Sequence, residues 1–139
     1  MSKKALAIVF AVYIAVILKL TLFRSATLPE REINLSLFTE LAAVLKEKGL
    51  PPFLRLFLGN IGWFIPLGFL LPAANKKCGF LKVVIIGLCF SLFVEISQFI
   101  FRKGFCEIDD LILNTFGTAV GFFAYRMSRF CIDKIRRLW

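Results

Sequence analysis

The sequence contains no histidine, and its eighteen lysines and arginines are accompanied by only nine acidic residues. Without histidine, the chain lacks the commonest general base at neutral pH and a leading metal ligand. The four cysteines are scattered over separate segments without a CxxC pair, so neither a zinc site nor a disulfide framework is indicated. They are interpreted as small hydrophobic residues or free thiols. No metal ion and no cofactor are expected.

Polar sequence is also scarce, because 59% of the residues are hydrophobic, against about 45–50% in globular domains. Four apolar runs of about 20 residues are each long enough to cross a hydrocarbon core of roughly 30 Å. A cleaved signal peptide is the competing interpretation of the first run, but that run is long, Lys19 interrupts it and no A-x-A-like site follows. The predicted membrane-spanning helices are residues about 5–23, 52–72, 80–101 and 109–129.

The predicted fold class is therefore all-α: an integral membrane four-helix bundle in which residues 1–139 form one domain. The long polar connection between the first two spans contains Leu37, Phe38, Leu41, Val44 and Leu45 on one helical face. This pattern predicts a short amphipathic helix over about 36–48, with Ser36 as its N-cap. Such a helix either lies in the membrane interface or covers the bundle as a lid.

The distribution of charge predicts an orientation in the membrane. Ten basic residues and one acidic residue fall in the N-terminus, the 73–82 loop and the C-terminal tail, whereas the other connections carry seven of each sign. The positive-inside rule then places both termini of a multi-pass plasma-membrane protein in the cytoplasm, with the lipid bilayer as its surroundings. The formal net charge of +9 does not indicate nucleic-acid binding, because no basic groove with interleaved aromatic residues is present.

Two series of residues place polar or small groups inside apolar sequence at helical spacing. The first series is Ser91, Glu95, Gln98 and Arg102. The second series is Asp110, Asn114, Gly117 and Gly121. Because a short loop joins the two spans, we expect antiparallel neighbours whose two stripes face each other. An acid within a span costs about 2.5–3.5 kcal/mol on insertion scales, so Glu95 requires an explanation.

The predicted orientation gathers the polar residues of the spans in the outer half of the membrane. The predicted polar cluster consists of Lys19, Asn60, Ser91, Glu95, Gln98, Arg102, Asp109, Asp110 and Asn114. One interpretation is a set of interhelical hydrogen bonds, each worth about 0.6 kcal/mol, with Lys19 or Arg102 neutralising Glu95. The other is a functional pocket open to the outer face. Its candidate catalytic groups are Glu95, Asp109 and Asp110, as acid–base carboxylates or oxygen ligands for a divalent cation.

Three blocks of this sequence resemble the VanZ-like family of small membrane proteins. The first block is LGNIGWFIPLGFLLP at 58–72, with the family's Gly-Asn and Phe-x-Pro-x-Gly pattern. The second is SLFVEISQ at 91–98, and the third is EIDDLILNTFGTAVG at 107–121. Together with the weaker matches KLTLFR and INLSLF, the resemblance covers most of the chain and preserves the order of its blocks.

The resemblance implies a function at the outer surface of the cell membrane, namely reduced susceptibility to teicoplanin and related lipoglycopeptides by binding or shielding. A lipoglycopeptide or a lipid-linked wall precursor would be met at that surface. A membrane enzyme acting on a lipid head group or lipid-linked precursor is the alternative, with Glu95 and the two aspartates in the chemistry. A purely structural subunit that supports a partner is the third possibility, and the sequence leaves open whether any reaction is catalysed.

Overall fold

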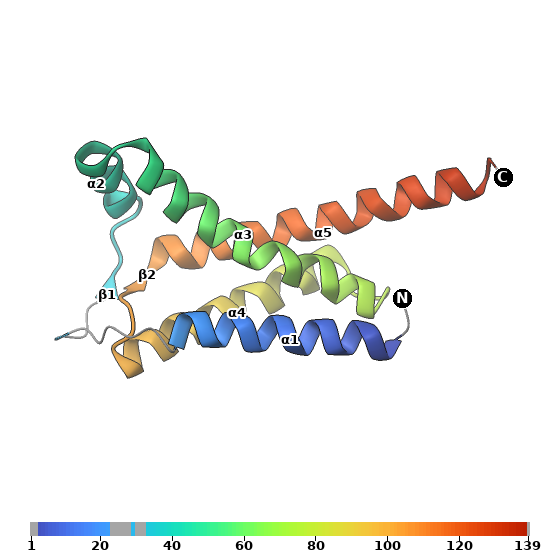
Figure 1. Ribbon diagram of the computed structural model, residues 1–139, viewed down its shortest axis with the longest axis horizontal. Helices are drawn as coiled ribbons and strands as arrows, with labels where there is room; N and C mark the ends of the chain where they lie inside the picture. The colour runs from blue at the N-terminus through green and yellow to red at the C-terminus, as the bar shows by residue number, and fades with distance from the viewer. Residues whose placement is uncertain (1–2, 23–28, 30–32, 139) are drawn as a thin grey trace.

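The computed structural model describes residues 3–22, 29 and 33–138 and is almost entirely helical there, which confirms the all-α class. The helices are α1 (Lys3–Leu22), α2 (Thr39–Lys48), α3 (Leu50–Ala74), α4 (Phe80–Phe101) and α5 (Ile108–Arg136). Two short strands lie at one end of the molecule (Figure 1). Strand β1 (Ile33–Asn34) precedes α2, and β2 (Cys106–Glu107) lies between α4 and α5.

Three of the described helices, α1, α3 and α4, are long and apolar enough to cross a membrane. The expected fourth span is not confirmed, because α5 is not among them. Its first half carries Asp109, Asp110 and Asn114, and its second half adds several basic residues, all of which lower its hydropathy. This helix also continues past the expected end at about 129 as far as Arg136.

The backbones of α3 and α5 lie in close contact, and Figure 1 shows the two helices crossing. A Cβ atom built on Gly117 would lie 2.2 Å from the carbonyl oxygen of Ile61, and one on Gly121 would lie 2.1 Å from that of Ile65. Small residues allow membrane helices to approach this closely. The expectation that the second stripe as a whole faces the third span is therefore wrong, since Gly117 and Gly121 face α3.

Another residue of the second series, Asn114, lies in the contact between α4 and α5. The side-chain amide of Asn114 donates a hydrogen bond to Ser91 Oγ at 2.9 Å, and both residues are buried. Thr118, one turn further along α5, is fully buried and donates to the carbonyl of Asn114 at 3.0 Å. The two stripes thus face each other at Ser91 and Asn114, as expected.

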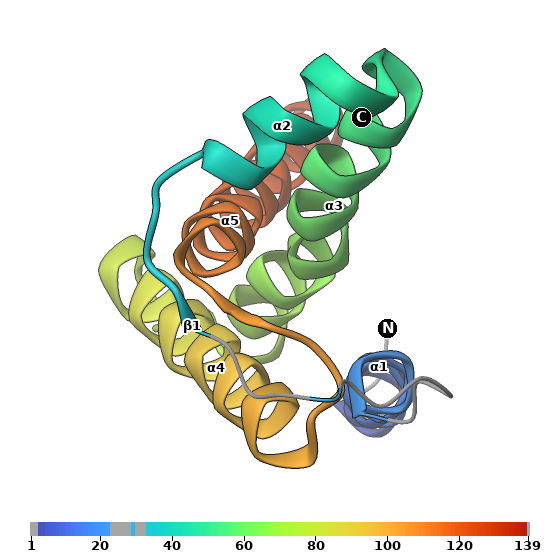
Figure 2. The same ribbon diagram turned by 90° about the vertical axis from the view of Figure 1, so that its left-hand side faces the viewer.

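Helix α1 lies at the edge of the bundle, and Figure 2 shows it apart from α5. The side-chain hydroxyl of Tyr13 in α1 donates a hydrogen bond to the backbone carbonyl of Trp63 in α3 at 2.8 Å. Apolar side chains such as Ile8 and Val12 are 63% and 56% exposed. An apolar surface of this extent is what a lipid-facing helix presents.

Helix α2 lies across the ends of α3 and α5 (Figure 2). Leu41 is buried with Ile61 of α3 and Leu113 of α5. The helix begins at Thr39 after the N-cap Phe38, so the expected N-cap at Ser36 is wrong. The packing favours the lid interpretation of this amphipathic helix, and its placement in a membrane interface stays a prediction.

Candidate functional site

Strand pairing brings the first loop against the connection between α4 and α5. Strands β1 and β2 run parallel, with Ile33 opposite Cys106 and Asn34 opposite Glu107. This pairing places the beginning of α2 beside the beginning of α5. The acidic residues of both segments meet at this end of the molecule.

Glu95 is enclosed at the centre of this end, with 2% of its surface exposed. Its Oε2 atom accepts a hydrogen bond from the backbone N–H of Glu107 at 3.2 Å. Asp110 lies close enough to repel its charge. Lys19, which was expected to pair with Glu95, is exposed on α1, and the two form no salt bridge in the part of the chain that the structure describes.

The consecutive residues Asp109 and Asp110 have different partners. Both carboxylate oxygens of Asp109 accept the backbone N–H of Phe38, at 2.8 and 2.9 Å. The carboxylate of Asp110 accepts a hydrogen bond from the side-chain amide of Asn60 on α3. Successive residues of a helix point about 100° apart, so the two carboxylates do not form one acid–base pair. Asp109 instead fixes the start of α2.

The carboxyl pair of this site is Glu40 and Glu107, whose side chains are hydrogen-bonded to each other. Burial raises the pKa of Glu107 to about 9, assisted by the hydrogen bond to Glu40 and by the nearby charges of Glu40, Asp110 and Glu95. At neutral pH the Glu40–Glu107 pair therefore holds a proton that the two carboxyl groups share in their hydrogen bond. Burial also raises the pKa of the Cys106 thiol, with Glu95 and Glu107 as further causes.

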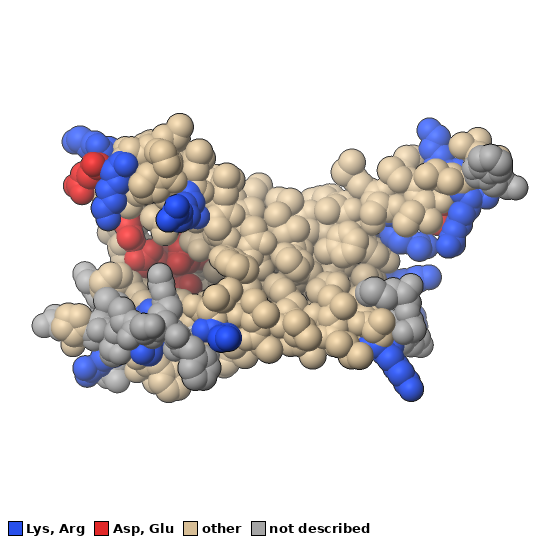
Figure 3. All heavy atoms as spheres, in the orientation of Figure 1, with Lys and Arg blue, Asp and Glu red and all other residues tan. Residues whose placement is uncertain are grey.

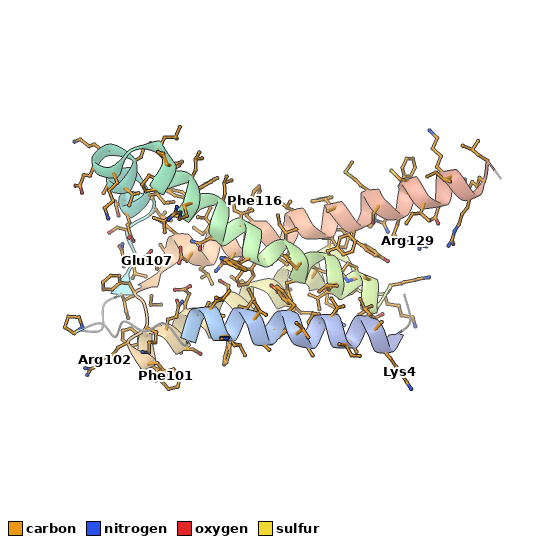
Figure 4. All side chains as sticks on the ribbon, viewed as in Figure 1. Lys4, Phe101, Arg102, Glu107, Phe116 and Arg129 are labelled. Atoms are coloured by element: carbon orange, nitrogen blue, oxygen red, sulfur yellow. The ribbon has the colours of Figure 1, made fainter. Side chains whose placement is uncertain are left out.

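Both glutamates line a pocket of about 340 Å³, which we call the acidic recess. The residues that line it are Asn34, Thr39, Glu40, Phe105 and Glu107. Figure 3 shows Asp and Glu atoms gathered in a hollow at the end of the molecule that carries α2. In Figure 4, Glu107 lies at this end, with Arg102 further out on the loop after α4. The recess therefore presents negative charge and hydrogen-bond acceptors to whatever enters it.

The match to known proteins decides the family. A family model described as VanZ/LLP1 matches residues 10–130. The chain belongs to the VanZ-like family. Protein VanZ of Enterococcus faecium is 42% identical over 74 residues, which are 53% of this chain and 46% of that relative. The chain thus spans about half the length of the curated relative it matches, and no solved structure matches it.

The VanZ-like chain brings together only part of the polar cluster expected from its sequence. Glu95 and Asp110 lie behind the recess, close to Glu107. Asn60 is hydrogen-bonded to Asp110, and Asp109 holds the start of α2. Gln98 is buried next to Gly104 in the loop after α4. Ser91 and Asn114 form their own pair between α4 and α5. Arg102 and Lys19 are exposed.

The Glu40–Glu107 pair is not among the site residues expected from the sequence. Glu107 stands directly before the acidic block of α5, which was a usable signal. Glu40 gave none, because acidic residues are common in the first turn of any helix. Within the described residues, no group of three or more cysteine, aspartate or glutamate side chains is arranged to hold a metal ion. A hydrogen-bonding or proton-sharing site is the chemistry that this geometry favours.

Proposed function

We propose that this VanZ-like membrane protein lowers susceptibility to teicoplanin-type lipoglycopeptides by binding a small polar group in the acidic recess. The group belongs to the antibiotic or to a lipid-linked wall precursor that the antibiotic recognises. The observation that carries the proposal is the Glu40–Glu107 pair with the buried Glu95 beside it. Carboxyl groups held close together repel each other, and such perturbed groups cluster at functional sites.

The orientation inferred from charge supports an outer-surface function. With both termini in the cytoplasm of a four-span bundle, the recess and α2 open toward the outside of the cell. Helix α2 then lies at the outer membrane surface, beside the layer in which lipid-anchored molecules present their head groups. A lipoglycopeptide would therefore encounter a binding site at this surface before it reaches the wall precursor that it recognises.

The size and charge of the recess define the kind of group that it holds. A volume of about 340 Å³ lies at the lower end of the range for ligand pockets, roughly 300–1,000 Å³. It accommodates one head group or one sugar-sized portion rather than a whole lipoglycopeptide. Carboxylate and amide oxygens accept hydrogen bonds, so the entering group carries an amine or several hydroxyl or amide donors.

A membrane enzyme is the second candidate, and one observation favours it. The Glu40–Glu107 pair shares a proton at neutral pH, and two carboxyl groups that share a proton can serve as the acid and the base of a hydrolytic or transfer reaction. Incubation with a lipid-linked precursor separates the candidates, because an enzyme changes the mass of the precursor whereas a binding protein returns it unchanged.

The experiment that tests binding uses two glutamates of α2. Glu40→Gln removes a carboxylate of the recess, whereas Glu47→Gln makes the same change at an exposed position outside it. We expect cells expressing Glu40→Gln to become as susceptible to teicoplanin as cells without the protein, and Glu47→Gln to retain resistance. Membrane levels of the variants are matched by immunoblotting. Equal resistance of both variants would refute the recess as the binding site.

A further inference from the structure

The C-terminal part of α5 projects beyond the rest of the bundle (Figure 1). We call residues 126–138 the α5 extension. None of these residues is buried. In Figure 4 the extension, with Arg129, lies at the same end of the molecule as Lys4 and opposite the acidic recess.

The extension separates apolar and basic side chains around its axis. At about 100° per residue, four apolar residues fall on one side: Met127, Phe130, Ile135 and Leu138. Ile132, which is 42% exposed, lies at the border of the two sides. Four arginines fall on the other side: Arg126, Arg129, Arg136 and Arg137. Figure 3 shows most of the basic atoms of the extension along its lower edge, with a smaller group at its upper edge.

Both sides are open to the surroundings of the molecule. Met127, Phe130 and Leu138 are 68%, 70% and 75% exposed, among the largest exposures of any apolar residue described. A helix adapted to water alone would not present three large apolar side chains in this way. A helix adapted to span the membrane would not carry four arginines in thirteen residues.

We propose that the α5 extension lies on the membrane surface and binds the head groups of anionic lipids. Five basic residues against Asp133 give the segment a net charge of +4, which is complementary to lipid phosphates. The apolar side enters the boundary of the acyl chains, as in other interfacial helices. Lys134, the basic residue on the apolar side, extends its stem along that boundary with its charge in the head groups.

The charge argues against a second copy of the chain as the occupant of the apolar side. Two extensions packed side by side would bring two segments of +4 together, and like charges oppose such contact.

The length of the extension limits how it can lie on the membrane. Thirteen residues extend about 20 Å, whereas each head-group layer is only about 5–8 Å deep. In Figure 1 the extension continues nearly parallel to α1, so keeping all four apolar residues in contact with lipid requires α5 to bend along the surface where it leaves the bundle.

Cys131 offers a probe in the middle of the extension, because its side chain is exposed. The full-length chain, with its three other cysteines changed to alanine, is labelled there with a fluorophore. It is reconstituted into vesicles of phosphatidylglycerol and phosphatidylcholine, or of phosphatidylcholine alone. We expect acrylamide, a neutral quencher, to quench the label at least threefold less in the anionic vesicles, and this protection to disappear in high salt.

Matched variants assign the effect to the extension. Arg129→Gln, Arg136→Gln and Arg137→Gln together are expected to abolish the protection. Lys46→Gln, Lys48→Gln and Arg55→Gln together remove three charges near the opposite end and are expected to preserve it. Asp133→Asn, which removes the acidic partner 3.5 Å from Arg129, is expected to raise the salt concentration needed to halve the protection.

Two results would overturn the proposal. Equal protection in neutral and anionic vesicles would show that lipid charge has no part in the docking. Protection that vanishes when the protein is diluted into excess lipid, together with Cys131–Cys131 cross-links in an unlabelled sample of the same protein, would identify a second copy as the occupant. If the triple arginine variant fails to fold, Asp133→Asn still tests the proposal. An unchanged salt concentration for half-protection in that variant also contradicts it.

Discussion

Both carboxylate oxygens of Asp109 accept the backbone N–H of Phe38, at 2.8 and 2.9 Å. Phe38 has a φ of 56°, in the left-handed region that bulky residues seldom adopt. Helix α2 starts immediately after it, with Glu40 in its first turn. Asp109 thus stabilises an unfavourable backbone conformation that places Glu40 over the acidic recess.

Replacing Asp109 is expected to weaken the attachment of α2. Asp109→Asn removes the charge that strengthens this hydrogen bond, and we expect the free energy of unfolding to fall by about 1–3 kcal/mol. Adding Phe38→Gly is expected to recover part of this loss, because glycine adopts a positive φ without strain. Thermal unfolding of the purified protein in detergent measures both effects. Asp133→Asn on the exposed end of α5 is the control, and a similar loss there would argue against a special role for Asp109.

The close contact of α3 and α5 predicts a large effect of one glycine. Gly117→Leu would force a side chain into the carbonyl of Ile61, and we expect the protein to unfold or to be absent from membranes. Gly62→Leu makes the same change on α3 where no atom of another element lies within 4 Å of the added Cβ, and we expect normal levels. Membrane abundance and monodispersity after extraction provide the measurement, and equal levels of the two variants would contradict the packing.

The stability of the protein is expected to depend on pH through Glu107. Its pKa is raised from the ordinary value of 4.5 to about 9 in the folded protein, so between these values the folded state holds a proton that the unfolded state has released. The stabilisation is complete below pH 4.5 and is lost as the pH rises toward 9. Glu107→Gln is expected to flatten this decline in melting temperature. A decline of the same slope in the variant would assign it to other groups.

The orientation in the membrane is tested by cysteine labelling in intact cells. If both termini are cytoplasmic, an impermeant maleimide labels Cys106, and Cys131 becomes accessible only after lysis. The raised pKa of the Cys106 thiol lowers its thiolate fraction, so labelling is expected to be slow at pH 7 and faster at pH 8.5. Labelling of Cys131 before lysis would reverse the proposed orientation.

Glu95→Gln separates a structural role from a binding role for the buried carboxylate. Glutamine keeps an oxygen that accepts the N–H of Glu107 and removes an ionisable group whose charged form is costly to bury. We therefore expect normal folding and abundance, or slightly higher stability, together with loss of teicoplanin resistance. Susceptibility is compared at equal membrane levels with Glu47→Gln as the control. Unchanged resistance would leave Glu95 with a structural role only, as the acceptor of the Glu107 N–H.

The sequence by itself determined the local features of this protein. The length and composition of its apolar runs specified helices, and the bounds expected for the third span, about 80–101, agree with Phe80–Phe101. Helical spacing also placed Ser91 and Asn114 on faces that meet. These features depend on residues a few positions apart, and hydrophobic burial with backbone hydrogen bonding is enough to fix them.

The tertiary structure decided which faces became partners. Periodicity shows that Gly117 and Gly121 share a face, but only the absence of their side chains at a crossing with α3 selects that neighbour. Asp109 and Asp110 are adjacent in sequence, yet the first reaches Phe38, 71 residues away, and the second reaches Asn60. The Glu40–Glu107 pair likewise depends on the pairing of β1 with β2. Contacts between distant segments are set by how whole surfaces pack, and no local pattern encodes that choice.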